Sequence, residues 1–231
     1  MSAPEIAGIL NELRSLGSEQ TLKTYRRHGL EGEAFGVKYG DIEKIARRLR
    51  KRADLASGLW KSGIHEARIL ACKISDPNKF DRATFEAWVK AANRLLIADL
   101  SSLIARSPDA TELAALWTAP TQSENSRITG WCVVSALASR DETIPRRWFE
   151  PFLDRIATEM AEAPNRLRYA LNGALISIGG RNDPALRDAA LHMAKRIGKV
   201  EIDHGETGCK TPDATAYIRK MWDRRKARAS T

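Results

Sequence analysis

The sequence predicts an all-α protein, a superhelical stack of antiparallel helix pairs. Apolar residues recur every three or four positions through most of the chain, which is the spacing of one helix face. We find no two-residue alternation of the kind typical of a half-buried strand. Prolines fall almost entirely between the periodic segments, where they delimit short helices: Pro77, Pro108, Pro120, Pro145, Pro164, Pro184 and Pro212. We expect about ten to twelve helices, with connections of the length found between packed antiparallel neighbours.

A repeated pattern, an arginine at the start of a helix with an apolar stripe behind it, organises the chain. It occurs first in residues 60–74, where Arg68 accompanies a stripe of Ala67, Leu70, Ala71 and Ile74. It returns at Arg127 and Arg168, which lie 41 residues apart (168 − 127), the period of HEAT-type helical repeats. Arg68 and Arg127 lie 59 residues apart (127 − 68), so the register is irregular. The pattern favours a HEAT-like helical-repeat solenoid.

The N-terminal part is predicted to form three helices separated by glycines. Residues 3–16 carry an apolar stripe, and residues 18–25 form a second helix that stops at Gly29. A glycine-punctuated loop follows at residues 33–41, and Asp41 is placed to cap a helix over residues 42–52. The basic residues that end this helix either contact phosphate or complement the helix dipole on a solvated face, which we favour.

A long helix is predicted from about Phe85 to Arg106, with Asp99 on its apolar face. Asp99 lies fourteen residues after Phe85 (99 − 85), which at 100° per residue returns it to within about 40° of the same direction. A carboxylate on an apolar face is costly unless it is paired, hydrogen-bonded or used. Asp99 is therefore either a functional acid or the partner of an arginine in the next repeat, for which Arg127 is the natural candidate.

Residues 203–213 are the least globular stretch of the chain. Thr211 is placed to cap the last helix, with Pro212 at its first position. The acid, histidine and cysteine before it lack the paired spacing of a metal site, so we expect a glycine-rich loop. His65-Glu66 also lacks the second histidine of a metal motif, and Glu66 is expected to be a first-turn acid that suits the helix dipole.

The chain is strongly basic. Its 231 residues suffice for a sizeable core, and 43% hydrophobic with 29% charged residues is ordinary for a soluble protein. The net charge of +9 and pI of about 9.7 suggest an anionic partner, most commonly nucleic acid, against the alternative of a generally basic protein. No low-complexity linker is present, so we expect one domain over residues 1–223. Residues 224–231 are expected to be a disordered basic tail that is solvated or attracts phosphate.

Three cysteines, Cys72, Cys132 and Cys209, are widely spaced. Their spacing does not fit a zinc site, and their odd number argues against a disulfide framework. We expect no metal and no cofactor, and buried thiols at Cys72 and Cys132. The N-terminus lacks the pattern of a signal peptide, and no run approaches the roughly 20 apolar residues of a membrane span. We therefore expect a cytoplasmic protein without a membrane partner.

Several of these segments together resemble the AlkD-like DNA alkylation repair family, as a divergent branch. They are Phe35-Gly36-Val37-Lys38, Trp60 with His65-Glu66-Ala67-Arg68, and Asp99; residues 203–213 resemble the C-terminal signature of one branch. The resemblance covers roughly Gly36 to Tyr217. It implies a curved stack of HEAT-like helix pairs whose basic concave face grips duplex DNA. Characterised members are glycosylases that release 3-methyl- and 7-methylpurines in base excision repair.

The resemblance also implies roles for particular residues. Asp99 matches the catalytic aspartate, which stabilises the oxocarbenium-like sugar and orients water in this hydrolase reaction. Arg127 matches an arginine that contacts DNA beside it. The implied DNA-binding residues are Arg127, Arg68, Arg94, Arg168 and Lys38, and the family-signature residues are His65, Glu66, His204 and Lys210. The implied partner is duplex DNA, alkylated or damaged, bound by a monomer.

Two departures from the family's pattern bear on activity. Leu95 and Gly173 stand where the active glycosylases have cleft tryptophans, so the carboxylate remains while its aromatic walls are missing. Trp131 and Trp88 fit their helix stripes and are more simply core residues. Two alternatives to a DNA-alkylpurine glycosylase therefore remain open: a non-catalytic module that binds branched or damaged DNA, and a protein-binding helical solenoid.

Overall fold

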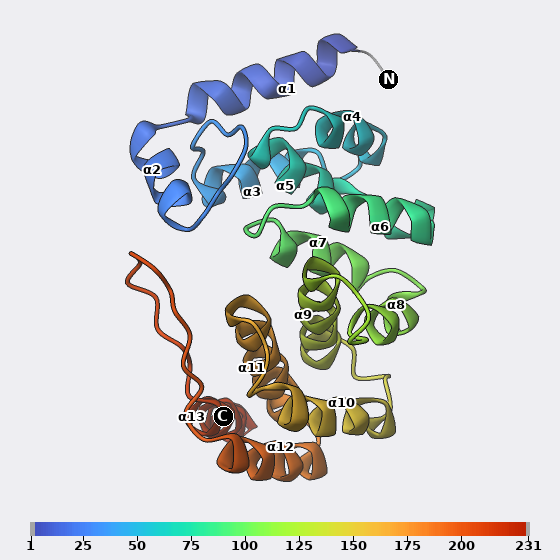
Figure 1. Cartoon of the computed structure of the whole chain (residues 1–231). Coiled ribbons are helices and arrows are strands. Elements are labelled where there is room, and N and C mark those ends of the chain that lie inside the picture. Colours follow the sequence, from blue (N-terminus) through green and yellow to red (C-terminus); the bar gives the residue numbers. More distant parts are fainter. Residues whose placement is uncertain (1–2, 230–231) are drawn as a thin grey trace. The chain divides into compact units, whose positions relative to one another are not determined.

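The computed structural model describes residues 3–229, and all of its regular structure is helical (Figure 1). The all-α prediction is confirmed for these residues, with slightly more helices than expected. The α-helices are α1 (Ala3–Leu16), α2 (Glu19–Arg27), α3 (Tyr39–Arg48), α4 (Ala56–Lys61), α5 (His65–Ile74), α6 (Arg82–Ala91), α7 (Ile97–Ile104), α8 (Ala110–Trp117), α9 (Glu124–Arg140), α10 (Arg146–Glu159), α11 (Asn165–Gly180), α12 (Pro184–Ile197) and α13 (Ala214–Ala229). Two short 3₁₀ helices, η1 (Ala53–Leu55) and η2 (Pro77–Lys79), complete the set.

The described residues form two compact units, where we expected one domain. The first comprises the chain up to Asp109 together with Gly205–Thr207, and it holds α1 to α7. The second comprises Ala110–His204 and the chain from Gly208 onward, and it holds α8 to α13. None of the helices in residues 3–229 is both long and apolar enough to cross a membrane.

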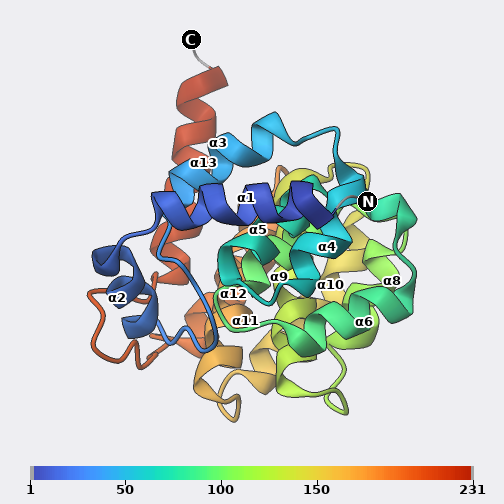
Figure 2. The same ribbon diagram turned by 90° about the horizontal axis from the view of Figure 1, so that it is seen from above.

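Helix α5 is the centre of the first unit. It packs against α1, α3, α4 and α7, and Figure 2 shows α1 lying across α4 and α5. The stripe predicted from spacing is buried throughout: Ala67, Leu70, Ala71 and Ile74. Small side chains on this face let neighbouring helices approach closely, which the sequence pattern indicated.

The predicted long helix around Asp99 is wrong. It is broken into α6 and α7 by residues 92–96. Asn93 explains the break, because its side-chain Oδ1 accepts hydrogen bonds from the backbone N–H groups of Leu95 (3.1 Å) and Leu96 (3.2 Å). An asparagine that binds its own backbone in this way competes with helical hydrogen bonding. Asp99 therefore lies in the first turn of α7.

Three helix starts or ends also differ from expectation. Helix α3 begins at Tyr39, so Asp41 lies in its first turn and pairs with Lys44 instead of capping the helix. Helix α13 begins at Ala214, and Asp213, not Thr211, accepts the capping hydrogen bond from the Ala216 N–H. The expected disordered tail is wrong over residues 224–229, which are the last turns of α13; residues 230–231 lie outside the described part.

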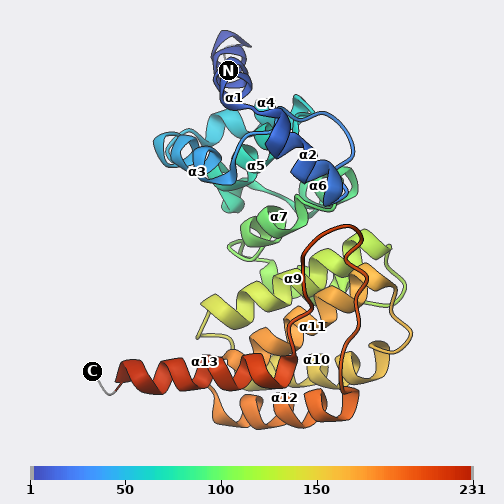
Figure 3. The same cartoon turned by 90° about the vertical axis from the view of Figure 1, so that its left-hand side faces the viewer.

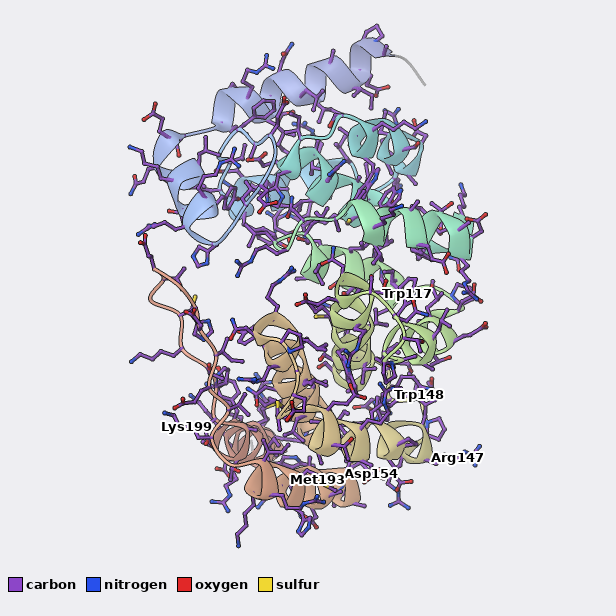
Figure 4. All side chains as sticks on the ribbon, in the orientation of Figure 1. Trp117, Arg147, Trp148, Asp154, Met193 and Lys199 are labelled. Carbon is purple, nitrogen blue, oxygen red and sulfur yellow. The ribbon has the colours of Figure 1, made fainter. Side chains whose placement is uncertain are left out.

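Helices α9 and α11 form the middle of the second unit. Helix α9 packs on α8 and α11, and α11 packs on α9, α10, α12 and α13. The large core side chains include Trp117, labelled in Figure 4 on α8, and Trp131 of α9. Helix α13 runs along α12, and its C-terminal turns extend past the end of α12 (Figure 3). Its middle is tied to α11, where Trp222 donates from Nε1 to the Gly179 carbonyl (2.8 Å).

Candidate functional site

Glu66 is completely buried at the start of α5, where it binds the glycine loop of the first unit. Its Oε1 accepts hydrogen bonds from three consecutive backbone N–H groups, those of Phe35 (3.1 Å), Gly36 (2.7 Å) and Val37 (3.1 Å). Gly36 has φ +78°, and a Cβ there would lie 2.3 Å from the Ser18 carbonyl oxygen. Glu66 is thus an acid in the first turn, as predicted, but its role is to fix this loop.

The loop that Glu66 fixes places Tyr39 against Asp99. The Tyr39 hydroxyl donates to Asp99 Oδ1 over 2.7 Å. Tyr25 holds the loop from the other side, because its hydroxyl donates to the Val37 carbonyl over 2.5 Å. Burial, together with the nearby Glu66 and Asp99 carboxylates, raises the pKa of Tyr25 to about 12, so its hydroxyl remains a donor at neutral pH.

Asp99 is buried, with 8% of its surface exposed, and its partner is Lys73. Lys73 Nζ lies 3.0 Å from Asp99 Oδ1 and 2.6 Å from Glu43 Oε1, and 4.6 Å above the centre of the Tyr39 ring. Burial opposes the charge on this ammonium, but the hydrogen bond to Glu43 and the attraction of Asp99 outweigh it and raise the pKa of Lys73. The burial of Asp99 is confirmed, while its predicted pairing with Arg127 is wrong.

His65 is a buried, neutral histidine beside this cluster. Its Nδ1 lies 3.3 Å from the Asn93 amide nitrogen, which is a donor, so this ring nitrogen accepts and the proton sits on Nε2. Its ring meets Tyr25 edge-on with centroids 5.3 Å apart. Burial lowers the pKa of His65. Within residues 3–229 no group of three His, Cys, Asp or Glu side chains could hold a metal ion.

The cations predicted to bind DNA from the first unit have different surroundings. Arg68 donates to the backbone carbonyls of Trp60 (3.3 Å) and Ala91 (3.1 Å) and lies over the Trp60 ring, so it is largely structural. Lys38 and Arg94 are both exposed. Arg94 lies along the backbone of Gly29, where a Cβ would come within 2.4 Å of its guanidinium.

The two predicted cations of the second unit are engaged within the protein. Arg127 pairs with Glu159 over 2.8 Å, and both side chains are mostly buried. Arg168 donates to the backbone carbonyls of Ala163 (3.0 Å) and Glu201 (3.3 Å). Neither guanidinium is placed as a free phosphate ligand.

The segment before α13 is held along one face of α11, which the sequence analysis missed. Asn165 makes two hydrogen bonds with the backbone of Asp203, and Asn172 donates to the Pro212 carbonyl (2.9 Å). His204 Nε2 lies 3.0 Å from the Thr211 hydroxyl, which closes the loop on itself. Two asparagines seven residues apart on one helix face were the available signal. Of the family-signature residues here, His204 is half-buried and Lys210 exposed.

The two positions without the expected tryptophans, Leu95 and Gly173, and the three cysteines also have defined surroundings. Leu95 is half-buried, and a Cβ at Gly173 would meet no atom within 4 Å. Trp88 and Trp131 are core residues, as predicted. Of the three cysteines, Cys72 is buried as expected, whereas Cys132 is half-buried and Cys209 is exposed.

Comparisons with known proteins agree with this architecture. A family model described as DNA alkylation repair enzyme matches residues 9–218. The chain is 32% identical over 220 residues to the uncharacterized protein Lin0241 of Listeria innocua, covering 92% of this chain and 95% of that protein. It is also 32% identical over 222 residues to the uncharacterized protein Lmo0209 of Listeria monocytogenes, covering 93% and 96%.

A solved structure is similar over nearly the whole chain. It is described as belonging to a new family of proteins related to the HEAT-like repeat DNA glycosylases with affinity for branched DNA structures. The TM-score is 0.84 at 26% identity, and the match covers 95% of this chain and 94% of that one. The predicted HEAT-like repeat fold is therefore confirmed.

Proposed function

We propose that this chain, which belongs to the DNA alkylation repair enzyme family, binds branched duplex DNA through a HEAT-like repeat fold and releases no bases. The proposal combines the family's relation to DNA with the chemical state of Asp99. A HEAT-like fold is compatible with both binding and catalysis, so the choice between them depends on the residues of the site.

The observation that carries the proposal is the pairing of Asp99 with Lys73. A carboxylate that promotes base release must face the positive charge that develops on the sugar. Its own surroundings must carry little positive charge. Here an ammonium lies 3.0 Å from Asp99 Oδ1, and the Tyr39 hydroxyl already donates to that oxygen. The cation neutralises the carboxylate and would repel an oxocarbenium-like sugar or a cationic methylated purine.

Binding is supported by the charge and by the structural relative. The chain carries a net charge of +9, and exposed cations such as Lys38, Arg94 and Lys210 are available for phosphate. The related structure has affinity for branched DNA, and it aligns with 95% of this chain. The first property to test is therefore whether the protein binds branched DNA more tightly than linear duplex DNA.

Base release from alkylated purines is the second candidate. It is favoured by the geometry of the carboxylate, since the hydrogen bond from Tyr39 and the ion pair with Lys73 both involve Oδ1, not Oδ2. An oxygen in that position would be the one to stabilise the sugar cation or orient water. Leu95 and the open surface at Gly173 supply no aromatic wall for the base.

The two candidates are separated by one paired experiment. Wild type, Asp99→Asn and the control Asp109→Asn, at an exposed aspartate, are incubated with methylated duplex DNA, and the freed purines are quantified. The same proteins are titrated with a four-way junction and with a linear duplex of equal length. We expect no released purine from any of them and tighter binding of the junction by all three. Release by wild type and Asp109→Asn, abolished in Asp99→Asn, would instead establish the glycosylase.

A further inference from the structure

The second unit presents exposed aromatic side chains that take no part in the candidate site around Asp99. Four large apolar side chains in the described residues are clearly exposed, and two of them, Tyr169 (48%) and Tyr217 (47%), belong to helices that pack against each other, α11 and α13. Exposed aromatic rings on two packed helices are features of binding surfaces.

Tyr169 is held in a rigid setting. Its ring meets His204 edge-on, with centroids 5.7 Å apart, and His204 is in turn fixed by Thr211. The loop carrying His204 is tied to α11 on both sides of Tyr169, at Asn165 and at Asn172. A ring that is already ordered loses little conformational freedom when a ligand stacks on it.

Space for a planar ligand adjoins the ring. Gly173 lies one turn after Tyr169 on the same helix face, and a side chain placed there would meet no atom within 4 Å. The surface next to Tyr169 is therefore bare backbone, which lets a flat group approach the helix closely.

Positive charge continues from this surface along α13. Lys220 and Arg224 follow Tyr217 at three and seven residues, so they share its helix face, and both are exposed. Neither has an ion-pair partner within residues 3–229. Figure 3 shows the C-terminal turns of α13 extending past α12. An aromatic ring beside unpaired cations is the chemistry that binds single-stranded nucleic acid, with stacking on the bases and attraction to the phosphates.

We propose that Tyr169 and Tyr217 stack on unpaired bases at the branch point of a bound DNA, while Lys220 and Arg224 contact the phosphates of the same strand. This assignment rests on the proposed DNA-binding function and gives it a source of branch preference. A linear duplex keeps its bases stacked inside the helix and offers nothing to the rings. A fork or junction exposes bases that can be splayed onto them.

The test measures binding of the full-length protein to three DNAs: a forked duplex with unpaired arms, the same fork with abasic nucleotides at the branch, and a blunt duplex. Tyr169→Ala removes the ring and Tyr169→Phe keeps it. Leu16→Ala, at an exposed apolar residue of the first unit (42%), is the matched control. Circular dichroism and thermal unfolding confirm that each variant is folded.

We expect Tyr169→Ala to weaken binding of the fork by roughly 5- to 150-fold, the loss of one stacked base, and to leave the blunt duplex within about twofold. Tyr169→Phe and Leu16→Ala should bind the fork like wild type. On the abasic fork, wild type should fall to the level of Tyr169→Ala, and the variant should lose little more.

Two results would overturn the inference in distinguishable ways. If wild type prefers the fork and Tyr169→Ala binds it equally well, the DNA-binding function stands and the stacking surface is wrong. If wild type binds none of the three DNAs in a salt-dependent manner, both proposals fail, and the exposed tyrosines would then be a surface for a protein partner.

Discussion

The two units differ in how they use their charged and aromatic residues. In the first unit, the two acids of the family-like segments are turned inward: Glu66 binds backbone N–H groups, and Asp99 is paired with Lys73. In the second unit, rings and cations remain available at the surface, among them Tyr169, Tyr217 and Lys220. The difference indicates that a family motif can identify the fold through its structural residues, while our proposal places the binding chemistry elsewhere.

The largest effect is expected at Glu66, because its removal leaves three N–H donors without an acceptor, two of them buried and one part-buried. Glu66→Ala should lower the free energy of unfolding by about 3 kcal/mol or more. Glu66→Gln should cost less, since its amide oxygen still accepts, and Glu31→Ala at an exposed position should cost almost nothing. Urea denaturation measures all three. A loss for Glu66→Ala no greater than that of Glu31→Ala would show that the loop is not fixed in this way.

A smaller effect is expected when the Asp99 pair is broken. Lys73→Met should destabilise the protein by about 2 kcal/mol, because it leaves the Asp99 carboxylate buried without its cation. Adding Asp99→Asn to that variant should recover part of the loss, giving an interaction free energy of at least about 0.5 kcal/mol. Strict additivity of the two changes in denaturation experiments would mean that the side chains do not interact.

Substitutions of the exposed cations of the second unit should change DNA binding and leave the free energy of unfolding unchanged. Each phosphate contact contributes roughly 0.9 to the slope of log K against log salt for duplex DNA, and roughly 0.7 for a single strand. Lys220→Gln together with Arg224→Gln should therefore reduce that slope by roughly 1.4 to 1.8. The matched control is Lys199→Gln, since Lys199 already pairs with Glu201 over 2.9 Å. Equal slopes for the double variant and the control would remove α13 from the DNA interface.

The smallest effect is a pH dependence of stability in the first unit. Burial lowers the folded-state pKa of His65, so the unfolded chain takes up this proton first as the pH falls. The contribution of neutral His65 is thus fully present above the unfolded value of about 6.5 and is lost as the pH drops below it. His65→Gln should flatten the decline of unfolding free energy between about pH 7 and pH 5. The control His192→Gln, at an exposed position of α12, should not. A decline of the same steepness in both variants would contradict this.

Local patterns predicted the fold well because they depend on near neighbours along the chain. The buried stripe of α5 and the burial of Asp99 both follow from the spacing of apolar residues. The single long helix predicted around Asp99 was wrong. The break at Asn93 escaped prediction because an apolar period continued across it, and a single side chain competing for the backbone decided the outcome.

The candidate site was predicted less well because its contacts join distant parts of the chain. Lys73 and Asp99 meet only when α5 packs on α7, and nothing near either residue marks the other as its partner. Arg127 and Arg168 were predicted to bind DNA from their repeated position. In the structure, Arg127 pairs with Glu159, and Arg168 donates to backbone carbonyls. The exposure of Tyr169 likewise depends on which helices surround α11.

The most direct test of the account is a salt titration of wild-type binding to a four-way junction and to a linear duplex of equal length. We predict that both affinities fall linearly with log salt and that the junction remains the tighter ligand at every salt concentration. Equal affinity for the two DNAs, or binding that does not change with salt, would contradict the proposal that this protein recognises branched DNA.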